Sequence, residues 1–92
     1  MDNYLDAVKE IQQRFRSANK ENIVKQIDKA LLIGGTDGER FSIICSLLRT
    51  LEISNPSIYE LVKRPADELL FYAEDIGYKI AANFDIFDEL SD

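Results

Sequence analysis

The stretch from Thr36 to Ile53, TDGERFSIICSLLRTLEI, constrains the fold more than any other part of the chain. Thr36 and Glu39 have the spacing of a capping box, in which the hydroxyl accepts the Glu39 amide and the carboxylate accepts the Thr36 amide. The helix that starts there is apolar around most of its circumference, so its neighbours must enclose it. The sequence therefore predicts an all-α fold, a compact bundle of four to six helices around a central apolar helix at about 37–53.

Two helices are expected before this central helix. Asp2 or Asn3 can cap the first, whose apolar positions between residues 4 and 15 recur every three or four residues. Asn19 can cap the second. Because the link between them is short, the two helices should be antiparallel neighbours.

Glycine and proline mark the remaining helix ends. Gly34-Gly35 follow the second helix, as is typical of a left-handed cap. Asn55-Pro56 can start a short helix, which Pro65 either kinks or ends near residues 63–64, and we favour a break because proline lacks an amide donor. A last helix then follows from about Pro65, and it either ends at Gly77 or continues to about Ala82.

A chain of 92 residues has room for one core only. We expect residues 1–82 to form a single helical domain and residues 83–92 an acidic-aromatic segment, either a short helix or a tail. No apolar run approaches the roughly 18 residues of a membrane span, and the N-terminus lacks the pattern of a signal peptide. The single Cys45 lies in the most apolar stretch. We therefore expect a cytoplasmic protein that binds no membrane.

The charge is unevenly distributed along the chain. Residues 1–46 carry seven acids and seven bases, whereas residues 65–92 carry eight acids against Lys79 alone. The last third therefore has a net charge of −7, compared with −6 for the whole chain. Such a field repels nucleic acid and attracts basic partners.

Several kinds of chemistry are disfavoured by composition. The absence of histidine removes the commonest general base and, with a single cysteine, leaves no zinc ligand set. Acids that are adjacent on a helix, such as Glu74-Asp75 and Asp88-Glu89, point about 100° apart and do not face each other. The GGTDGE segment lacks the Lys-Ser/Thr pair of a phosphate-binding loop, and no segment has the spacing of a calcium loop. We therefore expect a non-enzymatic protein without cofactor or metal.

The surface that we expect to bind a partner lies in the acidic last third. Tyrosine and phenylalanine rings anchor many protein interfaces, and carboxylates around them orient a basic partner and speed its association. The alternative is that the acids only keep the protein soluble and the rings belong to the core. Basic residues on the first two helices alternate with acids, so a solvated face is expected there. The expected partner-binding residues are Asp67, Glu68, Tyr72, Glu74, Asp75, Tyr78, Phe84, Asp85, Phe87, Asp88 and Glu89.

The middle of the chain resembles a class of bacterial proteins. Residues 34–39, GGTDGE, form a corner before the apolar helix, and a Pro-containing link leads to a Leu-rich helix that ends near Ile76-Gly77. With this pattern, residues 30–80 resemble small helical immunity proteins of contact-dependent or polymorphic toxin systems. The resemblance implies a cytoplasmic inhibitor that binds one cognate toxin domain, often a nuclease, and blocks its active site or its access to substrate.

Three hypotheses remain for the function. The first is an inhibitor that occupies a basic, nucleic-acid-binding cleft of a toxin domain, with carboxylates in place of phosphates. The second is a structural interaction module or homodimeric adaptor that associates through the apolar tail, residues 84–90. The third, a two-carboxylate enzyme, requires acidic side chains that converge in a cleft. We expect a monomer or a weak homodimer.

Overall fold

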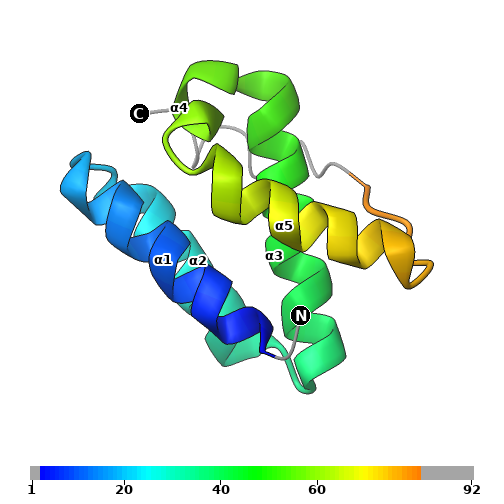
Figure 1. Cartoon of the computed structure of the whole chain (residues 1–92). Helices are drawn as coiled ribbons and strands as arrows, with labels where there is room; N and C mark the ends of the chain where they lie inside the picture. The colour runs from blue at the N-terminus through cyan, green and yellow to red at the C-terminus, as the bar shows by residue number, and fades with distance from the viewer. Residues whose placement is uncertain (1–2, 82–92) are drawn as a thin grey trace.

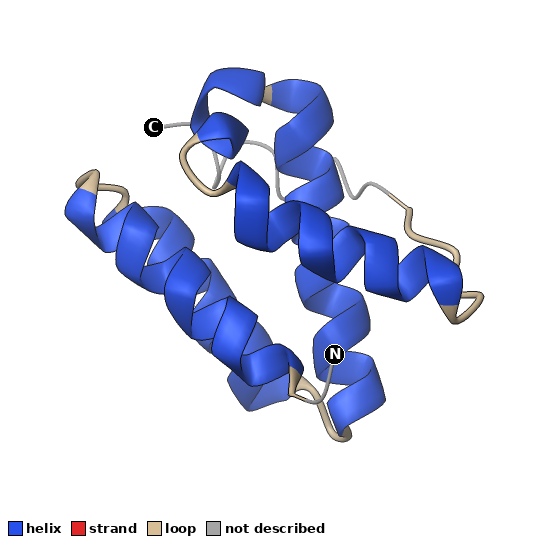
Figure 2. Ribbon diagram, in the orientation of Figure 1, coloured by secondary structure: helices blue, strands red, loops and turns tan. Residues whose placement is uncertain are grey.

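The computed structural model describes residues 3–81, and its architecture is a bundle of α-helices (Figure 1, Figure 2). The helices are α1 (Tyr4–Ser17), α2 (Glu21–Ile33), α3 (Asp37–Ser54), α4 (Pro56–Glu60) and α5 (Lys63–Asp75). Residues 3–81 contain no strand, so the prediction of an all-α bundle of four to six helices is confirmed. The expected acidic-aromatic segment, residues 83–92, lies outside the described residues.

α3 occupies the middle of the bundle. It packs against α2, α4 and α5, while α1 packs against α2 and α5. Figure 1 shows α1 and α2 side by side as the expected antiparallel pair. α3 buries most of its apolar side chains together with Thr50, whose hydroxyl donates to the Ser46 carbonyl at 2.7 Å. Ile43 and Ile53 face solvent, so the enclosure of α3 does not extend around its whole circumference.

The turn between α1 and α2 differs from the prediction. Asn19 does not cap α2, because its φ of 62° places it in the left-handed region directly after α1. The Asn19 amide donates to the Arg16 carbonyl at 3.1 Å, and the Lys20 amide donates to the Phe15 carbonyl at 2.8 Å. These two bonds form a Schellman motif, in which asparagine is one of the few residues that tolerate the left-handed position. Asn19 therefore ends α1.

Two predicted N-terminal caps are present. The Asn3 side chain accepts the Leu5 amide at 3.0 Å, and the Thr36 hydroxyl accepts the Glu39 amide at 3.1 Å. The other half of the capping box differs, since the Glu39 carboxylate accepts the Gly35 amide at 3.0 Å rather than the Thr36 amide. The carboxylate still lies at the N-terminal end of α3, where the helix dipole favours negative charge.

The corner between α2 and α3 requires Gly34 for a steric reason. Gly34 has a φ of −67° and a ψ of 123°, which other residues adopt readily, so the predicted left-handed cap is wrong here. A Cβ on Gly34 would lie 2.4 Å from the Arg40 Cγ and 3.0 Å from the Arg40 backbone nitrogen. The Arg40 Nε also donates to the Gly34 carbonyl at 3.1 Å. The two helices meet closely because Gly34 has no side chain.

Pro65 lies inside the first turn of α5 rather than at its start. α5 begins at Lys63, so Pro65 is its third residue. The amide that proline lacks would have no intrahelical partner at that position. The predicted break is present at Leu61 and Val62, two residues before the expected place.

α5 ends just before Gly77, which was one of the two predicted alternatives. Gly77 has a φ of 90°. The amides of Gly77 and Tyr78 donate to the carbonyls of Glu74 and Ala73 at 3.1 and 2.9 Å, which makes a second Schellman motif. Residues 78–81 are not helical, so a continuation towards Ala82 is wrong. The turn instead brings residues 78–81 back against α3.

Candidate interaction surface

The predicted partner-binding residues that the structure describes all lie on α5 or directly after it. They are Asp67, Glu68, Tyr72, Glu74, Asp75 and Tyr78. The remaining ones lie outside the described residues and are Phe84, Asp85, Phe87, Asp88 and Glu89. The described side chains divide into those that pack against other helices and those that face solvent.

α5 has one buried face and one exposed face, as expected of an amphipathic helix. Residues three and four positions apart lie on the same side of a helix. On the exposed face, Glu68 therefore precedes Phe71, and Glu74 and Asp75 follow it, while the half-buried Asp67 lies at the edge of this face. The buried face consists of Pro65, Ala66, Leu69, Leu70 and Ala73.

Phe71 is a surface residue that the sequence analysis does not identify. Its side chain is 73% exposed, although phenylalanine is usually buried. The sequence does contain a signal for it, because Phe71 falls out of phase with the core positions of α5 and has an acid three and four residues away on both sides. We call Phe71, Glu68, Glu74 and Asp75 together the α5 face.

The carboxylates of the α5 face differ in their pairing. Glu68 and Asp75 are exposed and pair with no cation within residues 3–81. Glu74 pairs with Arg49 of α3 at 2.5 Å, and the same guanidinium pairs with Glu52 at 2.6 Å. Burial lowers the pKa of Arg49, but the bonds to Glu52 and Glu74 outweigh this and raise the pKa above its usual value. Glu74 therefore holds α5 against α3 and contributes less free charge to the surface.

Asp67 takes part in the packing between α4 and α5. The buried Tyr59 hydroxyl donates to Asp67 Oδ1 at 2.6 Å. Burial raises the pKa of Tyr59, and the carboxylate of Asp67 raises it further. Because the half-buried Asp67 already accepts an internal hydrogen bond, we place it outside the α5 face.

Tyr72 and Tyr78 belong to a cluster of aromatic rings around Phe41. The ring of Phe41 makes edge-to-face contacts with Tyr4, Tyr72 and Tyr78, with centroid distances of 5.5, 5.8 and 5.7 Å. Each such pair contributes about 0.5–1.5 kcal/mol beyond its buried area. The cluster thus joins α1, α3, α5 and the segment after α5. Tyr72 and Tyr78 therefore contribute to the packing of the helices, which is the alternative role that the sequence analysis considers for the aromatic rings.

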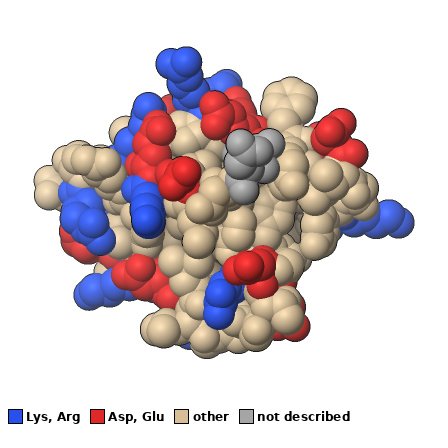
Figure 3. All heavy atoms as spheres, turned by 60° about the horizontal axis from the view of Figure 1, so that its bottom comes forward, with Lys and Arg blue, Asp and Glu red and all other residues tan. Residues whose placement is uncertain are grey.

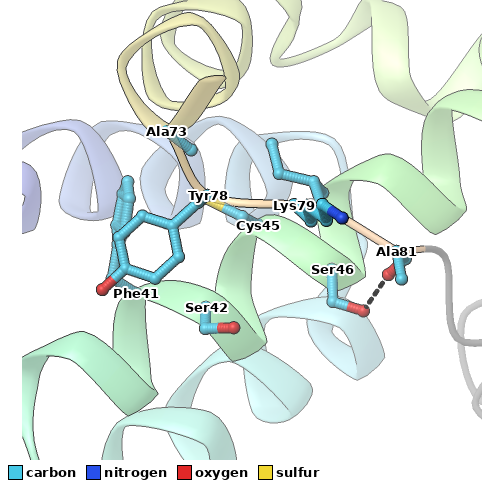
Figure 4. A pocket seen from close by; sticks show the side chains of 9 residues that line it. Phe41, Ser42, Cys45, Ser46, Ala73, Tyr78, Lys79 and Ala81 are labelled. Atoms are coloured by element: carbon cyan, nitrogen blue, oxygen red, sulfur yellow. Dashed lines mark hydrogen bonds between the residues drawn. The ribbon is translucent and has the colours of Figure 1, made fainter. Parts of the chain in front are cut away.

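A small cavity of about 120 Å³ lies between α3 and residues 78–81 (Figure 4). The Ser46 hydroxyl donates to the Ala81 carbonyl at 2.6 Å and holds this segment over the cavity. Cys45 is part of the lining, and burial raises the pKa of its thiol from 9.0 to about 12. The thiol therefore stays protonated at neutral pH, which makes it a poor nucleophile.

Acidic and basic side chains are intermixed on the face seen in Figure 3. On α1 and α2, Arg14 pairs with Glu10 at 2.8 Å and Arg16 with Glu21 at 3.7 Å, in agreement with the expected solvated face. In the described part of the chain, no group of three or more Cys, Asp or Glu side chains is placed to hold a metal ion. None of the helices in that part is both long enough and apolar enough to cross a membrane.

No protein-family model matches the chain, and no curated protein or solved structure matches it either. The resemblance to helical immunity proteins therefore stays a prediction. The features that bear on function are the geometry of the α5 face and the distribution of charge along the chain.

Proposed function

We propose that this chain is a non-enzymatic immunity-type inhibitor, which binds and neutralises a basic toxin domain, such as a nuclease, in the bacterial cytoplasm. The observation that carries the proposal is the α5 face, where Glu68 and Asp75 have no cationic partner within residues 3–81 and flank the exposed ring of Phe71. The surplus of acids after residue 65 gives the sign of the partner's charge. The resemblance of residues 30–80 to immunity proteins suggests the class of partner.

Charge complementarity acts before and during contact. The acidic face attracts a basic cleft over the Debye length, about 8 Å at physiological salt, and this attraction raises the association rate. A nuclease binds phosphates through lysine and arginine side chains, and carboxylates can pair with the same groups. α5 packs against α1, α3 and α4, so the helix that carries these carboxylates is in place before binding. Such preorganisation lowers the entropic cost of association.

The proposal predicts that an adjoining reading frame encodes a basic toxin domain, and it is tested with that domain. The wild-type chain should co-purify with this domain and restore the growth of cells in which the domain is expressed. Reversing two charges, Glu68→Lys with Asp75→Lys, should weaken binding at least about tenfold and reduce its dependence on salt.

A matched control is Asp6→Lys with Glu10→Lys, because these two acids are also exposed but lie on α1. This variant should protect cells as well as the wild type does. Full protection by the double α5 variant, or a wild-type chain that does not associate with the basic domain, would contradict the proposal.

A further inference from the structure

We infer that Phe71 is the anchor of the α5 face and that the partner offers it an apolar recess rimmed by lysine or arginine side chains. The inference rests on the proposed function and specifies the chemistry of the partner's surface. Carboxylates that merely replace phosphates in a nucleic-acid cleft would need no such recess.

The surroundings of Phe71 give it no evident role in packing. Its ring is 73% exposed, whereas Phe15 and Phe41 are buried in the core. The aromatic contacts described within residues 3–81 all centre on Phe41, and Phe71 takes part in none of them. A partner that covers this ring gains the free energy of removing its apolar surface from water. Large aromatic side chains contribute more than most residues to the affinity of interfaces.

The charges beside the ring determine what can cover it. Glu68 lies three positions before Phe71, and Glu74 and Asp75 lie three and four positions after it, so carboxylates flank the ring on both sides along α5. A purely apolar partner would remove water from these groups and give nothing in return. An apolar recess can cover the ring, and basic side chains around that recess can pair with the carboxylates.

The same charges oppose a homodimer through this face. A two-fold dimer brings the same surface patch of both copies together. In an antiparallel pairing with the two-fold axis at Phe71, Glu68 of one copy would lie near Asp75 of the other, and the exposed Arg64 would lie one turn beyond these like-charged pairs. The occupant that fits the α5 face is therefore a basic protein surface rather than a second copy.

Leu32 shows that exposure alone does not define such a site. Its side chain, at the end of α2, is 84% exposed. The charged residues three and four positions before it are Lys29 and Asp28, which have opposite signs. Leu32 thus lacks flanking charges of one sign, and it serves as a matched control for Phe71.

The inference is tested with a synthetic peptide of about sixteen lysine and leucine residues, long enough to form a helix with one apolar and one basic face. Its binding to the full chain is measured by fluorescence anisotropy and stopped-flow mixing. Phe71→Ala should weaken binding at least about tenfold, mainly through faster dissociation. Leu32→Ala should bind as the wild type does, and an oligolysine of equal length should bind more weakly than the lysine-leucine peptide.

Three results would overturn the inference. They are equal binding by the wild type and Phe71→Ala, equal binding of both peptides, and failure of the wild type to bind the lysine-leucine peptide. Each leaves the proposed function intact if the toxin domain is still neutralised. Binding that depends on Phe71, with a toxin domain that is not neutralised, contradicts the proposed function alone. Because Phe71 is exposed, Phe71→Ala should unfold at nearly the wild-type temperature, which excludes misfolding as the cause.

Discussion

The acidic side chains of α5 have similar chemistry but three different roles. Asp67 accepts the hydroxyl of the buried Tyr59, Glu74 pairs with Arg49, and Asp75 faces solvent. A carboxylate that holds another helix contributes to folding, and one that is free contributes to the field that a partner meets. Single substitutions should therefore separate stability from binding.

Tyr59→Phe tests the structural role of Asp67. The change removes the hydroxyl that donates to Asp67 and keeps the ring in the core. A hydrogen bond to a charged group contributes about 1.5–3 kcal/mol, and water can reach the half-buried Asp67 in the variant. We expect the free energy of unfolding, measured in denaturant, to fall by about 1–2 kcal/mol. Tyr72→Phe, whose hydroxyl has no described partner, should change it by less than about 0.5 kcal/mol; equal effects would assign the Tyr59 hydroxyl no stabilising role.

The buried thiol of Cys45 makes stability depend on alkaline pH. Burial raises the pKa of this thiol from 9.0 to about 12, so the folded state keeps a proton that the unfolded state loses above pH 9. This contribution is fully present below pH 9 and is lost as the pH rises to about 12, with a slope of about 1.4 kcal/mol per pH unit. Cys45→Ala should therefore remove the fall in the unfolding free energy between pH 9 and 10 and reduce it between pH 10 and 12, where the raised pKa of Tyr59 still contributes; the measurement is a denaturant titration at each pH. A slope identical to that of the wild type would show that the thiol ionises freely in the folded state.

The ends of the helices use asparagine and glycine in different ways. Asn19 and Gly77 adopt left-handed conformations in Schellman motifs, whereas Gly34 does not. The number and approximate bounds of the helices could be predicted because caps, prolines and apolar spacing are local features. The steric requirement for glycine at position 34 could not be predicted, because the atom that excludes a Cβ there belongs to Arg40 in the next helix. Local rules thus identify which residues end helices, and packing decides the conformation that each one adopts.

Gly34→Ala tests the steric account of the corner between α2 and α3. Its new Cβ would overlap the Arg40 Cγ and press on the Arg40 backbone nitrogen, so α2 and α3 would have to move apart. We expect a loss of about 1–3 kcal/mol in the free energy of unfolding, measured by thermal or denaturant unfolding. Gly35→Ala is the control, since its Cβ would meet only the Glu39 carboxylate at 3.3 Å, at the end of a flexible side chain. A cost as large for Gly35→Ala as for Gly34→Ala would contradict this explanation.

Across the whole molecule, the imbalance of charge could be predicted, but the way the charges are paired could not. The surplus of acids after residue 65 is a property of the sequence alone. Which of these acids are free depends on Tyr59 of α4 and Arg49 of α3, whose positions follow from the packing of three helices. The exposure of Phe71 is not predicted for a related reason, since an apolar residue in a helix is usually assigned to the core until the buried face is known. The sequence thus predicts which helix carries the surface, but it does not predict which residues of that helix form it.

Arg49 links stability to binding, and Arg49→Gln tests both. The variant releases Glu52 and Glu74 from the guanidinium and removes one positive charge, so the net charge becomes more negative by one. We expect the free energy of unfolding to fall by about 1–2 kcal/mol, a value reduced for the partial exposure of the pair. Association with the lysine-leucine peptide, measured by stopped-flow mixing, should become faster at low salt, and the gain should shrink as salt is added. Arg14→Gln makes the same change in net charge but frees Glu10 on α1 instead. If both variants accelerate association equally, net charge rather than the carboxylates of the α5 face governs the encounter.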